Sequence, residues 1–286
     1  MCCAALSACG GGRGAEGEGS SGLFGLGGGG GFFASRAAPL ETFTPEQIFR
    51  QAELQLEAGR ADDAAELFGE VERLYPYSAW AQRALIMQAF AYHTDRDYEN
   101  SRAAAQRYID FYPADEDAAY AQYLLALSYY DQIDEVGRDQ GLTFQALQAL
   151  RAVIERYPES EYARSSILKF DLAFDHLAAK EMEIGRYYLR RSHFPAAINR
   201  FRVVVEEFQT TTHTAEALHR LVEAYLSLGL ENEAQTAGAI LAFNFADTEW
   251  YAASFRLLVE RGLQAEAEGE SWLRRIYRQT IEGRWI

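Results

Sequence analysis

Histidine and acidic side chains recur one helical turn apart at two places, the spacing that puts two metal ligands or an acid–base pair on one helix face. His219 and Glu223 form one pair, and Asp171 and Asp175 form the other. A catalytic or metal site needs third and fourth groups that converge on the same point, and no motif in the sequence supplies them. Gly27–Gly31 is followed by neither Lys nor Ser/Thr, so it is no phosphate loop. We expect no enzyme, no catalytic residues, no metal site and no cofactor other than a lipid.

Thiol chemistry is confined to the start of the chain, where all three cysteines lie: Cys2, Cys3 and Cys9. Leu6-Ser7-Ala8-Cys9 resembles the bacterial lipobox, whose cysteine is cleaved at and acylated. The preceding segment is short and has no basic region, which a start codon placed too far downstream would explain. An accidental match is the alternative. We predict that residues 1–9 are a truncated signal and lipobox, with a lipid such as palmitate on Cys9.

A glycine-rich stretch follows the cysteines. Gly10–Gly31 contains thirteen glycines, with serine and glutamate between them and little that could pack. Such a composition behaves as a flexible chain, and some 30 residues of it span about 30 Å on average. We therefore predict a disordered tether over residues 10–41.

The clearest element of the folded body is a 34-residue helical repeat that begins at Gln82. The tetratricopeptide (TPR) pattern places small residues near positions 8 and 20, aromatic residues near 11 and 24, and proline at 32. Counting Gln82 as position 1 gives Ala89 at 8, Tyr92 at 11, Ser101 at 20, and Pro113 at 32. Small residues let two antiparallel helices approach closely, and proline ends the second helix.

Further copies share the same ending, an aromatic residue followed by proline. Pro76, Pro113 and Pro158 are 37 and 45 residues apart, so the third copy carries an insertion of about eight residues, which falls within 131–141. Two more copies follow, ending near Gln209 and Phe245. About five such repeats, none able to bury its apolar face alone, predict an all-α solenoid over residues 42–250.

Local signals set several helix boundaries. Thr44, Pro45 and Gln47 have the types and spacing of an N-cap with a capping box. Ser160–Leu189 contains no proline and one glycine, which predicts one long helix or two abutting helices. Helices at Thr214–Leu228 and Glu231–Phe243 are expected after it.

The last segment, residues 251–286, is a C-terminal helical extension in this interpretation. Its apolar residues recur at helical spacing with arginines between them: Trp272, Leu273, Ile276, Tyr277, Ile281 and Trp285. A cap over the last repeat is the preferred role, and a partner-binding helix is the alternative.

Overall composition narrows the class of partner. The formal net charge is −15 and the isoelectric point is about 4.8, which argue against nucleic acid. No run of 18 apolar residues exists, so no membrane-spanning segment is predicted.

Several motifs together resemble the BamD family, the TPR lipoproteins of the outer-membrane β-barrel assembly machinery (BAM complex). The resemblance covers about Phe43–Phe245 and rests on the aromatic–proline endings and their spacing, on Ser160-Glu161-Tyr162, and on three later stretches: Tyr187-Tyr188, Ala196-Ala197-Ile198-Asn199-Arg200 and Ala224-Tyr225. The glycine tether, the missing signal sequence and the extension past Trp250 depart from the family pattern.

The resemblance implies a scaffold anchored by lipid in the outer membrane of a Gram-negative bacterium and facing the periplasm. Its implied partners are the periplasmic domains of a BamA-type barrel subunit, other lipoproteins of the complex, and unfolded outer-membrane β-barrel proteins bound by their C-terminal strand.

The residues suggest where such partners bind. First-helix groove positions of the early repeats are rich in aromatic residues with one cation: Phe49, Arg83, Ile86, Phe90, Tyr120, Tyr123 and Tyr130. They suit an extended segment that ends in an aromatic residue and a carboxylate, with Arg83 binding the charge. Inter-repeat core is the alternative role for each of them. We expect residues 42–158 to hold substrate and residues 159–250 to dock the machinery, with Arg186 and Arg200 as docking contacts.

Two other functions fit a TPR solenoid. A periplasmic adaptor for cell division or peptidoglycan synthesis usually carries an N-terminal coiled coil, and no heptad segment precedes these repeats. A cytosolic co-chaperone would show a clamp of several basic residues, whereas the chain has only two lysines, Lys169 and Lys180.

Overall fold

The computed structural model describes residues 40–265, 273 and 276, and contains helices but no strands within that part of the chain. By its internal contacts the chain forms two compact units, residues 1–42 and 43–286. In the first, the described residues form a short 3₁₀ helix, Leu40–Thr42. The predictions for Cys9, for the tether up to residue 39 and for most of 266–286 lie outside the described residues. None of the described helices has both the length and the apolar character needed to cross a membrane.

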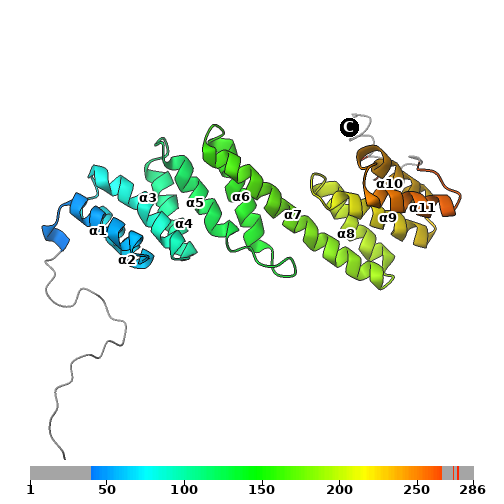
Figure 1. Ribbon diagram of the computed structural model, residues 1–286, viewed down its shortest axis with the longest axis horizontal. Coiled ribbons are helices and arrows are strands. Elements are labelled where there is room, and N and C mark those ends of the chain that lie inside the picture. The colour runs from blue at the N-terminus through cyan, green and yellow to red at the C-terminus, as the bar shows by residue number, and fades with distance from the viewer. Residues whose placement is uncertain (1–39, 266–272, 274–275, 277–286) are drawn as a thin grey trace, which may run out of the picture. The chain divides into compact units, whose positions relative to one another are not determined.

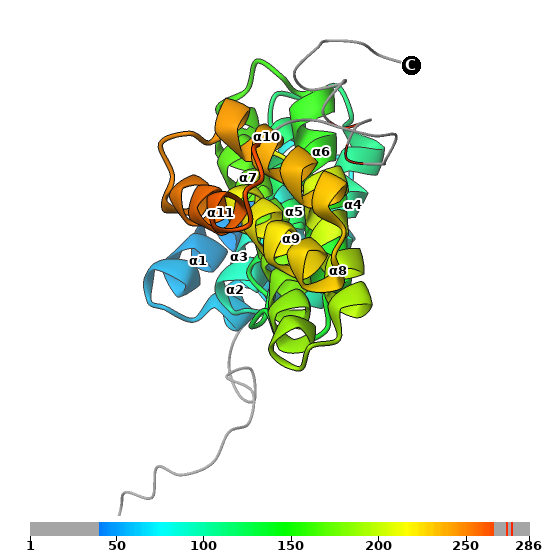
Figure 2. The same cartoon turned by 90° about the vertical axis from the view of Figure 1, so that its right-hand side faces the viewer.

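The second unit is a succession of antiparallel helix pairs. Consecutive helices lie side by side (Figure 1), and the first helices of neighbouring pairs, α1, α3, α5 and α7, also contact one another. The helices are α1 (Pro45–Glu57), α2 (Ala61–Leu74), α3 (Ala79–Thr94), α4 (Tyr98–Phe111), α5 (Ala118–Tyr130), α6 (Gly141–Arg156), α7 (Glu161–Arg190), α8 (Phe194–Glu207), α9 (Thr214–Leu228), α10 (Glu231–Asn244) and α11 (Glu249–Glu260). Figure 2 shows the same helices from the end that carries α11. This is the predicted all-α array of TPR-type helix-turn-helix repeats.

Small residues at the predicted repeat positions lie at the helix crossings. Ala52, Ala89 and Ala126, at position 8 of the first three repeats, are all fully buried. Position 20 is equally buried in all five repeats, where it is occupied by Ala64, Ser101, Ala146, Ala197 and Ala234. Because these side chains are short, the paired helices approach closely and interlock.

Helix ends follow the local chemistry of the sequence. Thr44 caps α1 with a complete capping box: its hydroxyl accepts from the backbone of Gln47, and the Gln47 side chain accepts from the backbone of Thr44. Gly229 ends α9 in the left-handed conformation, with φ of 74°, where a side chain would be strained.

Helix α7 is a single helix of 30 residues. Its N-terminal part, as far as Leu177, packs on α5 and α6, with Ala173 and Leu177 against Leu147. Its second half packs on α8, and Met182 shares a core with Phe201. One continuous element therefore joins the two halves of the array.

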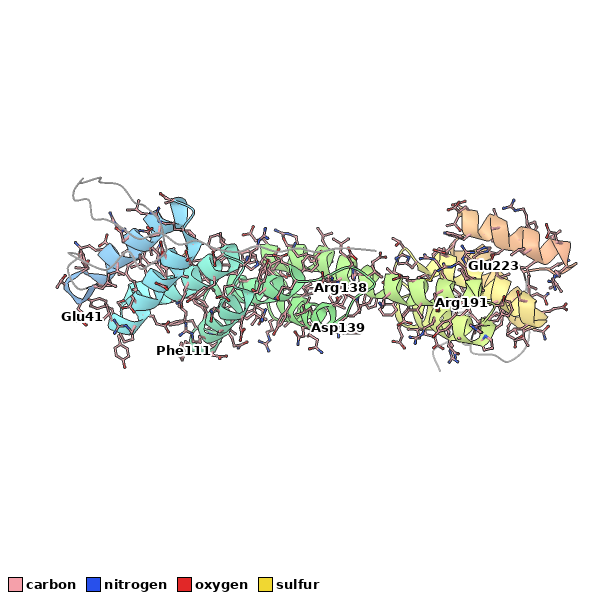
Figure 3. All side chains as sticks on the ribbon, turned by 90° about the horizontal axis from the view of Figure 1, so that it is seen from below. Glu41, Phe111, Arg138, Asp139, Arg191 and Glu223 are labelled. Atoms are coloured by element: carbon pink, nitrogen blue, oxygen red, sulfur yellow. The ribbon has the colours of Figure 1, made fainter. Side chains whose placement is uncertain are left out.

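The predicted insertion is the loop between α5 and α6, which ends where α6 begins at Gly141. Arg138 and Asp139 on this loop are exposed (Figure 3). The Nζ atom of Lys180 on α7 donates to the backbone carbonyl of Gly137 at 2.6 Å. The Nδ1 atom of His176, also on α7, lies 3.1 Å from Oε1 of Gln140 at the end of the loop. The insertion is therefore tied to the long helix at Gly137 and Gln140, and Arg138 and Asp139 between them are open to solvent.

Beyond the fifth repeat, α11 packs against α9 and α10 (Figure 2). The predicted boundary at residue 250 falls inside this helix. Leu258 of α11 is buried, and Leu273 and Ile276 belong to the same core cluster. These two residues of the C-terminal segment therefore pack into the core at the end of the array.

Candidate functional site

Three tyrosines gather on the first-helix face where α5 meets α7. The ring of Tyr162 at the start of α7 lies 5.2 Å from that of Tyr120 and 5.4 Å from that of Tyr123, centre to centre. All three are half-buried. Burial raises the pKa of all three hydroxyls, that of Tyr120 to about 12, so they stay protonated and able to donate. We call Tyr120, Tyr123 and Tyr162 the tyrosine cluster.

A cation stacked on aromatic rings lies on the same series of first helices, at α1 and α3. The guanidinium carbon of Arg83 is 5.5 Å from the ring centre of Phe49 and 5.2 Å from that of Trp80. Arg83 is exposed and forms no ion pair with any described residue. Its charge is therefore held in place by ring faces while its N–H groups remain open to a ligand. We call Arg83, Phe49 and Trp80 the Arg83 stack.

The other predicted groove residues differ in exposure. The Nζ atom of Lys169 on α7 lies 4.7 Å from the ring centre of Tyr130, which is half-buried, as is Phe90. Phe49 and Ile86 are only 2% and 6% exposed, because they pack between α1, α2, α3 and α4 as inter-repeat core. Those two side chains support the groove from beneath and present almost no surface to a ligand.

A local motif outside the repeat pattern, and missed by the sequence prediction, places three aromatic residues on this face. Three aromatic residues each occupy the second position of a first helix: Trp80, Tyr162 and Trp250. The N-cap residue, two positions earlier, has a hydroxyl that accepts a hydrogen bond from the helix backbone. Each ring packs on the preceding first helix, against Phe49, Tyr120 and His219 respectively. The signal is Ser/Thr-x-Trp/Tyr at the start of a helix, and it recurs at residues 78–80, 160–162 and 248–250.

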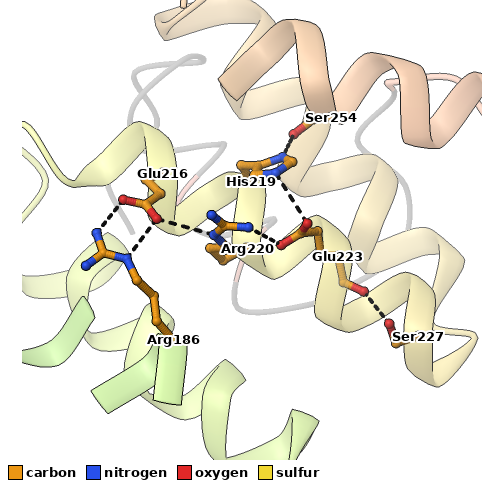
Figure 4. A network of polar contacts seen from close by, with 7 residues as sticks. All are labelled: Arg186, Glu216, His219, Arg220, Glu223, Ser227 and Ser254. Atoms are coloured by element: carbon orange, nitrogen blue, oxygen red, sulfur yellow. Dashed lines mark hydrogen bonds and ion pairs between the residues drawn. The ribbon is translucent and has the colours of Figure 1, made fainter. Parts of the chain in front are cut away.

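Arg186, a predicted docking contact, is paired within the chain. Its Nε and Nη2 donate to the two carboxylate oxygens of Glu216 on α9, at 2.9 and 2.5 Å (Figure 4). Arg220 donates both to Glu216, at 3.3 Å, and to Glu223, at 2.8 Å. Since two cations alternate with two carboxylates, this network of ion pairs fastens α7 to α9 rather than leaving a free charge.

The electrostatics of this network favour the ionised acids. Burial works against ionisation of Glu216 and Glu223. The hydrogen bonds that Glu216 accepts from Arg186 and Arg220, and that Glu223 accepts from His219 and Arg220, outweigh burial and lower both pKa values. His219, whose side chain is 6% exposed, lies 2.8 Å from the Ser254 hydroxyl and 3.5 Å from Glu223. Glu223 lies on the same helix as His219, so it is the contact of His219 with Ser254 that links α9 to α11. Among the described residues, no group of three or more His, Cys, Asp and Glu side chains could hold a metal ion.

Arg200, the second predicted docking contact, lies on α8 and is separate from the Arg186 network. Its Nη1 donates to the carboxylate of Glu181 on α7 at 3.1 Å, and its side chain is 43% exposed. It borders an open pocket of about 270 Å³ lined by Tyr188, Ala196, Asn199, Arg200 and Val203. This pocket combines apolar walls with one accessible cation.

Stacked helix pairs with aromatic rings along their first helices define a scaffold of the TPR type. A family model described as YfiO, outer membrane lipoprotein, matches residues 41–241, so the chain belongs to this family.

The names of curated relatives agree with this family assignment. The chain is 46% identical over 223 residues to the outer membrane protein assembly factor BamD of Caulobacter vibrioides, covering 78% of this chain and 73% of that protein. It is 41% identical over 221 residues to the BamD of Rickettsia prowazekii, covering 77% and 86%. A solved TPR protein of Thermus thermophilus aligns with a TM-score of 0.35 and 20% identity, over 74% of this chain and 98% of that one.

Proposed function

We propose that this chain is a lipid-anchored periplasmic scaffold of outer-membrane protein assembly, and that the tyrosine cluster and the Arg83 stack receive unfolded barrel proteins. Membership of a family whose curated members are named assembly factors supports the general role. It also favours this role over that of a division or peptidoglycan adaptor. The observation that carries the binding site is the set of half-buried rings, which gives Tyr120, Tyr123 and Tyr162 one common surface on two first helices.

The chemistry of the two sites suits the end of an unfolded barrel strand. Alternate side chains of an extended segment point the same way, so its apolar and aromatic residues can pack on the tyrosine rings while the hydroxyls bind its backbone. A terminal carboxylate needs a cation that is not already paired. Arg83 meets that requirement, because the rings of Phe49 and Trp80 hold it without neutralising it.

The second half of the array supplies the docking contact in this proposal. Arg200 would leave Glu181 to bind a carboxylate of the barrel subunit's periplasmic domain, whose apolar neighbours would enter the pocket beside Tyr188. Arg186 would act indirectly, since its bonds to Glu216 fix the position of α9 against α7. A lipid on Cys9 would hold the chain at the membrane.

The groove is tested by fluorescence anisotropy with a labelled peptide that ends in phenylalanine and carries a free C-terminal carboxylate. Tyr123→Ala removes one ring of the tyrosine cluster, which is worth about 0.5–1.5 kcal/mol beyond its buried area, so we expect Kd to rise about 3- to 10-fold. Arg83→Gln should weaken the binding of the peptide with a free carboxylate and leave the affinity for a C-terminally amidated peptide unchanged. Tyr77→Ala is the matched control, because that ring is fully exposed on the α2–α3 loop and should not matter.

Equal affinity of wild type, Tyr123→Ala and Tyr77→Ala for the peptide would show that the tyrosine cluster is not the binding site.

Docking is tested separately, by purifying the chain from detergent-treated membranes with a tag after Ile286. The Arg200→Glu variant should no longer co-purify with a large barrel protein that has periplasmic domains, whereas Arg190→Glu, a change at an exposed residue of α7, should retain it. Recovery of peptidoglycan or division proteins instead would support the adaptor alternative.

A further inference from the structure

The turn between α7 and α8 is a basic region of an acidic protein. The chain has 42 acidic residues against 27 lysines and arginines, yet the segment 184–205 contains five arginines and neither aspartate nor glutamate. Three of those arginines form ion pairs with glutamates of the same chain. The other two, Arg190 and Arg191, are exposed and form no ion pair within the part of the chain that the structure describes. Two adjacent cations therefore remain unneutralised at this point of the surface.

An exposed tyrosine lies on the same face as these two arginines. Tyr187 precedes them by three and four residues on α7, so the three side chains lie within about 100° of one another around the helix axis. The guanidinium carbon of Arg191 is 4.4 Å from the ring centre of Tyr187, which is 43% exposed. The next two residues, Ser192 and His193, are exposed as well. We call Tyr187, Arg190 and Arg191 the arginine–tyrosine patch.

We propose that the arginine–tyrosine patch binds the phosphate groups of an anionic lipid surface and so orients the folded body against the membrane. A guanidinium group presents several N–H donors to a phosphate, and a tyrosine places an apolar ring and a polar hydroxyl at the level of the lipid headgroups. Each arginine near an anionic bilayer strengthens binding about 5-fold. The stacking of Arg191 on Tyr187 holds both groups on the same exposed face.

A contact of this strength is useful to a chain that is already held at the membrane, so the inference rests on the proposed lipid on Cys9. The predicted glycine-rich tether of some 30 residues would leave the folded body free to rotate. A lipid on the same chain would raise the effective concentration of the patch at the bilayer, and a lipid chain with a basic patch binds stably where either alone is weak.

The charge of the rest of the chain limits which region can approach an anionic surface. The net charge of −15 means that most of the protein is repelled, over a Debye length of about 8–10 Å. Glu183, exposed and one turn before Tyr187 on α7, limits the patch on that side. An acidic protein is the competing occupant, but a stable protein partner needs about 800 Å² of matching surface. A lipid surface needs only the cations and an interfacial ring, which the patch has.

The test is flotation of the full chain carrying Cys9→Ser with vesicles of phosphatidylcholine, prepared with and without phosphatidylglycerol. This parent chain should bind only the anionic vesicles, and more weakly at high salt. The double change Arg190→Gln and Arg191→Gln should lower the partition coefficient about 25-fold, since each lost cation costs about 5-fold. The double change Arg164→Gln and Arg256→Gln is the matched control, because it removes two exposed arginines elsewhere and gives the same net charge.

A change of the opposite sign makes the test sharper. Glu183→Gln removes the acid beside the patch and should raise the partition coefficient, by up to about 5-fold. Circular dichroism confirms that each variant is folded. Equal binding of the two double variants to anionic vesicles would overturn the proposal. So would equal binding of the parent chain to vesicles with and without phosphatidylglycerol.

Two further measurements separate this inference from the proposals on which it builds. Mass spectrometry of the chain extracted from membranes shows whether Cys9 carries a lipid, whereas flotation of the Cys9→Ser chain detects the patch alone. If the parent chain does not bind anionic vesicles, and the Arg190→Gln and Arg191→Gln chain loses a protein in the detergent purification described above, the patch serves an acidic protein and the proposal is wrong.

Discussion

Replacing Gly185 with alanine is expected to destabilise the contact between α7 and α8. A Cβ atom at residue 185 would lie 2.8 Å from both Cδ1 and Cζ of the Phe201 ring, and closer still to Cε1. Carbon atoms in contact normally lie about 3.5–4.0 Å apart. Phe201 is fully buried in the core of the fourth and fifth repeats, so its ring has no free space into which to move.

The expected magnitude is the difference between two effects. Alanine is favoured over glycine inside a helix by about 1 kcal/mol. Inserting a methyl group into a packed core costs about 1–3 kcal/mol. The free energy of unfolding should therefore fall by up to about 2 kcal/mol, which lowers the melting temperature by about 2–4 °C per kcal/mol in a folded unit of this size.

Urea unfolding followed by circular dichroism measures the change, and a double-mutant cycle locates it. Phe201→Leu, which shortens the opposing side chain, should make Gly185→Ala less costly than it is alone. Gly137→Ala, in the α5–α6 loop with no atom within 4 Å of its Cβ position, is the control for a methyl group without a clash. A Gly185→Ala chain about 1 kcal/mol more stable than wild type would show that only helix propensity matters there, and would refute the argument.

Two further predictions concern buried polar contacts. Glu216→Gln should lower stability at neutral pH by about 1–2 kcal/mol, because the bonds from Arg186 become weaker than those to a carboxylate. The pKa of Glu216 is lower in the folded than in the unfolded chain, so its contribution to the free energy of unfolding is fully present above pH 4.5 and is lost as pH falls through the pKa of the folded state. The urea midpoint should therefore fall less steeply between pH 6 and pH 3 in Glu216→Gln than in wild type. Asp115→Ala should cost about 1–3 kcal/mol, because the hydroxyl of Tyr108 donates to Asp115 at 2.6 Å and would lose that acceptor.

Each of these predictions has a neighbouring control. Glu231→Gln on α10 and Glu116→Ala in the α4–α5 loop remove exposed carboxylates and should change stability by less than about 0.5 kcal/mol. A pH dependence in Glu216→Gln as steep as that of wild type would assign the acid sensitivity to other groups. Equal stability of Asp115→Ala and Glu116→Ala would show that water replaces the lost acceptor of Tyr108.

The repeat architecture could be predicted because its signals are local. Small residues at one repeat position mark where paired helices cross: Ala52, Ala89 and Ala126. The capping box formed by Thr44 and Gln47 marks the start of α1. The absence of proline from residues 160–189 predicted one long helix or two abutting helices, and the structure has a single helix there, Glu161–Arg190. Each of these signals depends on chain geometry over a few residues, which a single sequence displays.

The site was harder to predict because first-helix positions alternate between groove and core over less than one turn. Phe49 and Ile86 occupy groove positions in the sequence pattern, yet the rings and aliphatic chains of neighbouring helices cover them. Tyr162 and Trp80 were missed as site residues since their position counts from the helix N-cap rather than from the repeat. The pairing of Arg186 with Glu216 joins residues 30 positions apart, which no local pattern reports.

The continuity of α7 sets a mechanical limit on how the two halves of this array can influence each other. Tyr162 near its start and Arg186 near its end are separated by an unbroken helix of 24 residues, about 36 Å. A helix of this kind transmits rotation and translation as a rigid strut, whereas a flexible linker would absorb them. A ligand that shifts the tyrosine cluster would therefore displace the far end of α7 by a comparable amount. The length of α7 would therefore fix the distance between the proposed substrate site and the proposed docking site.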